Sequence, residues 1–209
     1  MDAPTNHSNE HMTERIFRFG NEVVYICLLS VVWLIASLPL ITVGAATIGV
    51  YTSMLSHLKD GNKQYIRPFW NGFTSGLRRA ALRTFFLVLL VGLTGFNAYY
   101  YLVTRGSPTG IVLCVVQALL CVAGVILVTH DVAGLASHFA ADLSGTLPTF
   151  RDACHKAISS PLKSVLIAAV TLGVPAIFIV TNLWQFAIFG IGVICYSNTR
   201  ILLWKGYDS

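Results

Sequence analysis

The sequence predicts an all-α, polytopic helical membrane protein, and three observations lead to this class. Of its 209 residues, 55% are hydrophobic and only 11% are charged, with a mean hydropathy of +0.69. The apolar residues gather in long blocks without charge, and the basic residues lie between those blocks. A soluble domain has about 25% charged residues. So little charge excludes a water-soluble globule, a disordered chain and a nucleic-acid-binding protein.

Four blocks lack Asp, Glu, Lys and Arg: 23–58, 84–104, 106–130 and 164–199. The two middle blocks each suit one transmembrane helix, because about 20 residues cross the hydrocarbon core. The first and last blocks have 36 residues each. A single helix of that length would be about 54 Å long, well beyond a core of about 30 Å. Each of these two blocks must therefore contain a turn.

Residues that interrupt helices indicate where the two turns lie. Pro39 removes a backbone donor and disfavours helix before it, and Thr42 is placed to cap the helix that follows. The second turn is predicted at 181–185, whereas Pro175 is expected to kink its helix without ending it. The result is one membrane domain, 21–205, between a cytoplasmic tail, 1–20, and a C-terminal tail, 206–209. Its six predicted helices are 21–38, 43–58, 84–104, 109–130, 164–181 and 184–203.

The distribution of Lys and Arg predicts the orientation. With both termini in the cytoplasm, 13 of the 14 basic residues lie on the inner side of the membrane, and only Arg105 lies outside. A five-span alternative, in which the first block crosses once, keeps the same inner loops and moves the N-terminus outside. The sequence favours six spans and leaves five open, since helix 43–58 is short enough to be re-entrant.

Both inner loops predict a short amphipathic helix at the membrane surface. In the first loop, Ile66, Phe69, Phe73 and Leu77 follow helical spacing, and the arginines fall mostly beside this stripe, facing anionic headgroups. The second loop has a similar stripe after Pro148. The residues expected to contact lipid or a partner are Arg67, Phe69, Trp70, Phe73, Arg78, Arg79 and Arg83.

Segments 81 residues apart resemble one another. Ser56-His57-Leu58 corresponds to Ser137-His138-Phe139, and Gly92 corresponds to Gly173. A duplicated helix–loop–helix unit and a chance match both remain open.

The spans offer little chemistry. Their interior lacks Asp, Glu, Lys and Arg, which argues against a proton-coupled pump. Nucleophile elbows, phosphate loops, dinucleotide fingerprints and zinc-protease motifs are absent from the sequence. We therefore expect a protein that is not an enzyme, with no catalytic residues and no cofactor. The candidates for a metal site are His57, His130, Asp131 and His138, although polar residues at helix exits explain the same pattern, and we expect no metal.

Other residues are expected to pack helices together. Pro39 and Thr42 shape the first turn, and Gly44 and Gly49 offer a small surface for close approach. Asn97 and Gln117 are the two amides well inside spans. They are expected to hydrogen-bond between helices, and a solute site is the alternative.

Three segments resemble a known family. They are Ser37-Leu38-Pro39-Leu40-Ile41-Thr42-Val43-Gly44-Ala45-Ala46, the small helix that carries Tyr51, and Phe69-Trp70-Asn71-Gly72-Phe73. Over about residues 18–90 the chain resembles the YesL-like family of bacterial integral membrane proteins, a family of unknown function. Its members are often encoded beside carbohydrate ABC-type uptake systems.

The resemblance implies a non-catalytic accessory partner of ABC-type sugar transporter subunits, bound to a bilayer with anionic headgroups and to no nucleic acid. The alternative is a small transporter or facilitator of a neutral solute. The oligomeric state stays open.

Overall fold

The computed structural model describes residues 7–61, 64, 66–104, 108–141, 146–180 and 187–204. Every regular element in these ranges is helical, as the sequence predicts. The helices are α1 (His7–Ala36), the short 3-10 turn η1 (Leu40–Thr42), α2 (Val43–Asp60), α3 (Ile66–Arg79), α4 (Ala81–Thr104), α5 (Pro108–Ala140), α6 (Phe150–Ser159), α7 (Pro161–Val180) and α8 (Ala187–Leu203). The predicted turn at 181–185 and the tail 206–209 lie outside the described residues.

Helix α2 forms the centre of the molecule. Its buried residues point in almost every direction around the helix axis, and they contact α1, α3, α5 and α8. The buried apolar side chains of α2 are Ala45, Ala46, Ile48, Val50, Tyr51, Met54 and Leu55. Tyr25 and Leu29 of α1, Phe69 of α3 and Leu135 of α5 complete this core. A helix that is apolar on all sides needs such a surrounding layer.

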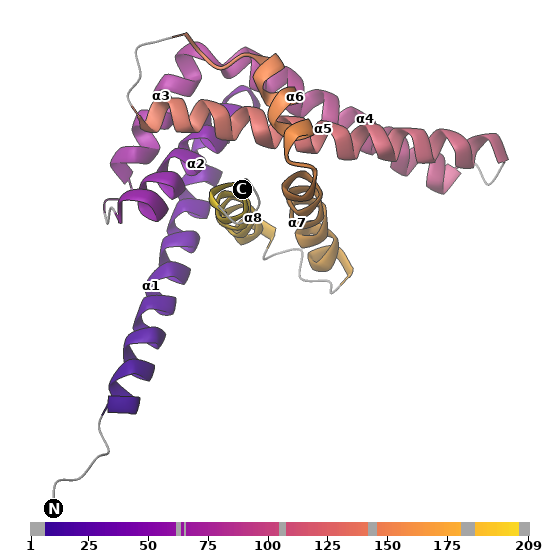
Figure 1. Cartoon of the computed structure of the whole chain (residues 1–209). Helices are drawn as coiled ribbons and strands as arrows, with labels where there is room; N and C mark the ends of the chain where they lie inside the picture. Colours follow the sequence, from indigo (N-terminus) through magenta and orange to yellow (C-terminus); the bar gives the residue numbers. More distant parts are fainter. Residues whose placement is uncertain are drawn as a thin grey trace, which may run out of the picture.

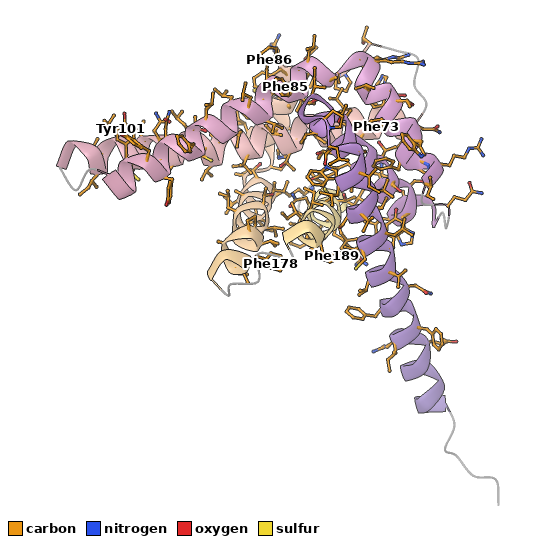
Figure 2. All side chains as sticks on the ribbon, turned by 180° about the vertical axis from the view of Figure 1, so that it is seen from behind. Phe73, Phe85, Phe86, Tyr101, Phe178 and Phe189 are labelled. Atoms are coloured by element: carbon orange, nitrogen blue, oxygen red, sulfur yellow. The ribbon has the colours of Figure 1, made fainter. Side chains whose placement is uncertain are left out.

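Other long helices extend away from this core. Helices α4 and α5 form an antiparallel hairpin that extends far beyond α2, and the N-terminal half of α1 extends in another direction (Figure 1). Figure 2 shows Phe85, Phe86 and Tyr101 along the α4/α5 hairpin, distant from Phe178 and Phe189 on α7 and α8. Large apolar side chains cover the outside of this hairpin, among them Phe86 and Leu119. Such a surface is unfavourable in water and suits lipid.

Among the described residues, the helices long and apolar enough to cross a membrane are four: Glu14–Ala36, Ala81–Tyr101, Ile111–Ala140 and Pro161–Phe178. A fifth apolar segment, Phe189–Leu203, is shorter, and α2 is not among the candidates. In the six-span prediction Gly44 and Thr84 lie at opposite membrane surfaces. In the structure they are in contact, because α4 begins beside the turn between α1 and α2, and a Cβ on Gly44 would overlap the Thr84 hydroxyl. Over the part of the chain that the structure describes, the regular elements are therefore all helices, and four of them are candidate spans.

Two predicted boundaries need correction. Helix α1 begins at His7, so residues 7–20 of the predicted tail are helical. Between His7 and Ala36 the chain has no proline and only one glycine, so nothing interrupts the helix. Helix α5 continues ten residues past the predicted end, to Ala140. The prediction stopped at Asp131 because it is charged, but this carboxylate is paired inside the fold.

Candidate functional site at a basic junction of helices

Two units of the chain share one order of elements, a long helix, a short helix and a long helix. We call α2–α3–α4 the first unit and α5–α6–α7 the second unit. Shifting α3 and α4 by 81 residues, the spacing of the similar segments in the sequence, brings them onto α6 and α7. Helices α1 and α8 flank the two units and pack against each other. Polar side chains lie where the two units meet.

An ion pair joins the first unit to the second. Arg83, in the first turn of α4, donates from Nη2 to Asp131 Oδ1 in α5, and from Nη1 to the Pro148 carbonyl at 2.7 Å. The Asp131 side chain is 1% exposed, whereas the Arg83 side chain is 30% exposed. A buried carboxylate is stable only when it is paired and hydrogen-bonded. Arg83 therefore works as an internal partner of Asp131, a role that the sequence did not predict.

The neighbouring residue, His130, faces the other side of α5. Its Nε2 lies 3.0 Å from Ser164 Oγ in α7. Ser164 Oγ donates its single proton to the Ala157 carbonyl at 2.9 Å, so His130 Nε2 is the donor to Ser164. His130 and Asp131 thus connect α5 to two different helices, and they do not converge on a common ligand.

A cavity of about 310 Å³ opens beside His130. Helices α2, α5, α6, α7 and α8 and the residue between α6 and α7 provide its wall. Its polar lining residues, which we call the basic pocket, are Lys59, His130, Ser137, Lys156, Ser160 and Lys163. Leu55, Ala133, Gly134, Leu202 and Leu203 form the apolar remainder. From the sequence these lysines indicate only the cytoplasmic side, because nothing in their spacing shows that they converge.

The outer surface of α3 is a second basic feature. Arg67, Trp70, Arg78 and Arg79 are exposed there, and we call this group the α3 face. The opposite side of α3 is buried through Phe69, Gly72 and Gly76. Phe69 is 0% exposed and stacks on Phe73 at 6.0 Å between ring centroids. Phe69 was predicted to contact lipid or a partner, and it is instead a core residue.

Glycines bring α3 unusually close to α2. A Cβ on Gly72 would lie 2.5 Å from Thr52 Oγ1 and 3.1 Å from Gly49 Cα. A Cβ on Gly49 would lie 2.9 Å from the Phe69 carbonyl oxygen. The predicted stripe of large apolar residues on α3 missed this contact, because the side of α3 that packs is partly made of glycine.

The other predicted metal-site residues are also dispersed. His57 stacks on Tyr25, with ring centroids 4.4 Å apart, and His138 meets the edge of Phe139. Across the part of the chain that the structure describes, no three His, Cys, Asp or Glu residues are close enough to hold a metal ion.

The predictions for the remaining packing residues agree only in part with the structure. Thr42 Oγ1 donates to the carbonyls of Ala36 and Pro39, both at 2.6 Å, and makes no cap on α2, so its predicted cap is corrected. Asn97 is exposed on α4, and Gln117 Oε1 on α5 is buried without a hydrogen-bond partner in the described structure. The predicted hydrogen bond between these amides therefore does not involve Gln117 Oε1.

Polar contacts that the sequence did not predict fasten α1 and α8. Tyr196 in α8 donates to Glu22 in α1, and Arg200 lies 3.5 Å from the other oxygen of that carboxylate. About two turns earlier in α8, the Phe189 carbonyl accepts a hydrogen bond from Ser30 Oγ of α1 at 3.4 Å. The pairing of later α1 residues with earlier α8 residues shows that the two helices are antiparallel.

Helix α6 begins with a carboxylate cap. Asp152 Oδ2 accepts from the Thr149 amide at 2.8 Å and from the Thr149 hydroxyl at 2.9 Å. These two hydrogen bonds to the ionised form lower the pKa of Asp152 below its ordinary value. The short helix that carries Lys156 therefore has a fixed starting point.

Comparison with known proteins concerns mostly the first unit. A family model described as "Protein of unknown function, DUF624" matches residues 24–98, from the apolar part of α1 to most of α4. YesL-like proteins belong to this family, and the match overlaps the segments on which that resemblance was based. Searches of curated proteins and of solved structures found no match to the chain.

Proposed function

We propose that this chain is a multi-pass protein of the bacterial cytoplasmic membrane that serves as a non-catalytic accessory partner of an ABC-type carbohydrate uptake system. One observation carries the proposal: the α3 face is exposed and basic, while the reverse side of the same helix is held tightly on α2. A rigid surface with arginines and an exposed tryptophan has the composition of a contact site for another protein.

The class of partner comes from the YesL-like resemblance and its association with carbohydrate uptake systems. The family match covers α3, so the segment that would make the contact lies inside the matched region. The antiparallel contact between α1 and α8 supports the placement of both termini on one side of the membrane. The basic residues around the α3 face support the assignment of that side to the cytoplasm.

The test is crosslinking in the native membrane. A photoreactive amino acid replaces Trp70 in one strain and Ile158 in another. Both side chains are exposed, and Ile158 lies on α6, away from the α3 face. We expect the probe at 70 to crosslink to a permease subunit of the uptake system, and the probe at 158 to give much less of that product. Equal yields from the two positions, or only lipid adducts from position 70, would overturn the proposal.

A quantitative version uses charge removal. The triple substitution Arg67→Gln, Arg78→Gln and Arg79→Gln should reduce co-purification of the permease subunit in mild detergent. Arg151→Gln, an exposed arginine on α6, serves as the control and should leave recovery unchanged.

The neutral-solute facilitator has less support. Asn97, one of its two expected site residues, lies on the exposed side of the α4/α5 hairpin and does not face an enclosed path. Flux of a sugar into vesicles that contain the purified protein, absent from protein-free vesicles, would favour it over the accessory role.

A further inference from the structure

The basic pocket has a charge distribution that the accessory role does not explain. Three lysines from three helices line one cavity: Lys59 at the end of α2, Lys156 on α6 and Lys163 in the first turn of α7. Among the described residues that line it there is no Asp or Glu. Asp152, four residues before Lys156, lies outside the lining and accepts hydrogen bonds from Thr149 at the start of α6. The described lining itself therefore carries positive and no negative side chains, which favours an anion.

Burial strengthens the effect of these charges. Lys163 is only 7% exposed, and His130 beside it is 3% exposed. Charges act more strongly on one another where water is scarce, because the effective dielectric constant is lower. Lys59 and Lys156 are exposed at the mouth. The lysines thus form a gradient from an open entrance to a buried end.

The surrounding elements suit an oxyanion. A lysine ammonium group carries three N–H donors, and several such groups around one cavity suit an anion with several acceptor oxygens. Helix α7 begins at Pro161, directly after Ser160 of the pocket, and a helix N-terminus carries partial positive charge. This N-terminus adds to the lysines and is not needed to define the site.

The volume and the lining of the basic pocket limit the ligands that fit it. A volume of about 310 Å³ lies at the lower end of the range for small-molecule sites, roughly 300–1,000 Å³. Leu55, Leu202 and Leu203 form the apolar part of the wall, and the lysines form the charged part. Basic pockets between membrane helices are known to hold phosphorylated headgroups. A ligand with a phosphate at one end and a less polar part at the other matches both walls.

We propose that the basic pocket binds the phosphate group of a small phosphomonoester, carried either by a lipid headgroup or by a soluble metabolite. Lys59, Lys156 and Lys163 hold the phosphate oxygens, and the leucines contact the rest of the ligand. This site is separate from the α3 face, so its test does not depend on the accessory role.

The experiment measures the thermal unfolding temperature of the full-length protein in neutral detergent, with two pairs of probes. The soluble pair is glycerol 3-phosphate against glycerol at matched ionic strength. The lipid pair is phosphatidic acid against diacylglycerol of the same acyl chains. The members of each pair differ only in the phosphate. We expect a saturable rise in unfolding temperature with the phosphate-bearing member of at least one pair.

Variants then assign the response to the pocket. Lys156→Gln and Lys59→Gln change exposed side chains, so both variants are expected to fold. Each should weaken the apparent affinity about ten-fold or more, since it removes a charge-assisted contact. Arg151→Gln, on the same helix as Lys156 but outside the pocket, should retain the affinity of the native protein.

Each outcome has one meaning. A response to phosphatidic acid alone identifies a lipid headgroup, a response to glycerol 3-phosphate alone identifies a soluble ligand, and responses to both identify the phosphate as the recognised part. The proposal is overturned if neither phosphate-bearing probe stabilises the protein beyond its matched control. It is also overturned if Arg151→Gln weakens the response as much as Lys156→Gln.

Discussion

The first and second units share an order of helices but are held together in different ways. In the first unit α3 lies against α2 with almost no space between them, because Gly49 and Gly72 let the two backbones approach. In the second unit α6 buries only Ala153, and its ends are fixed by polar contacts instead. Close packing leaves α3 one exposed surface, whereas loose packing leaves α6 beside an open cavity. The same sequence of elements can therefore give a rigid surface in one unit and a pocket in the other.

The largest expected effect comes from breaking the link between the units. Arg83→Gln should destabilise the protein by about 3–5 kcal/mol, because it leaves the buried Asp131 carboxylate without its partner. Unfolding by denaturant in detergent measures this loss. Adding Asp131→Asn should restore part of the stability, since the uncompensated charge disappears. A loss well below about 1 kcal/mol for Arg83→Gln would show that the two units are held by other contacts.

Next in size is the substitution Gly72→Ala in the first unit. The new Cβ would collide with Thr52 and approach the α2 backbone, so we expect a loss of about 1–3 kcal/mol and a lower unfolding temperature. Gly173→Ala in α7 is the matched control, because nothing lies within 4 Å of its Cβ position. That control should be neutral or gain up to about 1 kcal/mol from helix propensity. Similar losses at both positions would remove the distinction between the units.

A smaller, local effect is expected in the second unit. Asp152→Ala removes the carboxylate that accepts from Thr149, so α6 should open more often. The measurement is the rate of maleimide labelling at Cys154, quantified by mass spectrometry, which should rise while the global unfolding temperature changes little. Thr74→Ala on α3 removes a hydroxyl that bonds only within its own helix, and should leave the labelling rate unchanged.

The smallest effect is the pH dependence of the same cap. The folded pKa of Asp152 is lowered, so its contribution is complete above the ordinary value of 3.8 and is lost as pH falls through the lower folded pKa. Pepsin cleavage within α6 between pH 5 and pH 2 measures this change. Native protein should resist better than Asp152→Asn at the upper end, and the two should converge at the lower end. A constant ratio across this range would contradict the role of the ionised cap.

Much of the fold was predictable because hydrophobic blocks and helix breakers act locally. Helix α1 ends shortly before Pro39, as predicted, and Pro175 was expected to lie within α7, as it does. The predictions that failed depended on distant partners. Asp131 seemed to end a helix because a charge is unfavourable in an apolar segment, and only Arg83, 48 residues earlier, makes it stable there.

The two candidate sites also differ in whether local sequence or distant contacts define them. The arginines of the α3 face were recognisable because a helical period within one short segment separates them from the apolar side. The basic pocket was not, because Lys59, Lys156 and Lys163 are brought together from distant parts of the chain. Phe69 was assigned to the wrong environment because sequence spacing does not show that the neighbouring glycines make that side of α3 the packed one.

By itself, the sequence indicated that much of the chain suits lipid, that the chain is helical, and where most helices lie. These properties follow from apolar content, from the positions of charged residues and from the local conformational limits of proline. The tertiary structure decided that α2 is a central helix and not a candidate span, that Arg83 has an internal partner, and that three lysines share a cavity. Each of these depends on which surfaces meet in three dimensions, and contacts between distant segments leave no periodic signal in one chain.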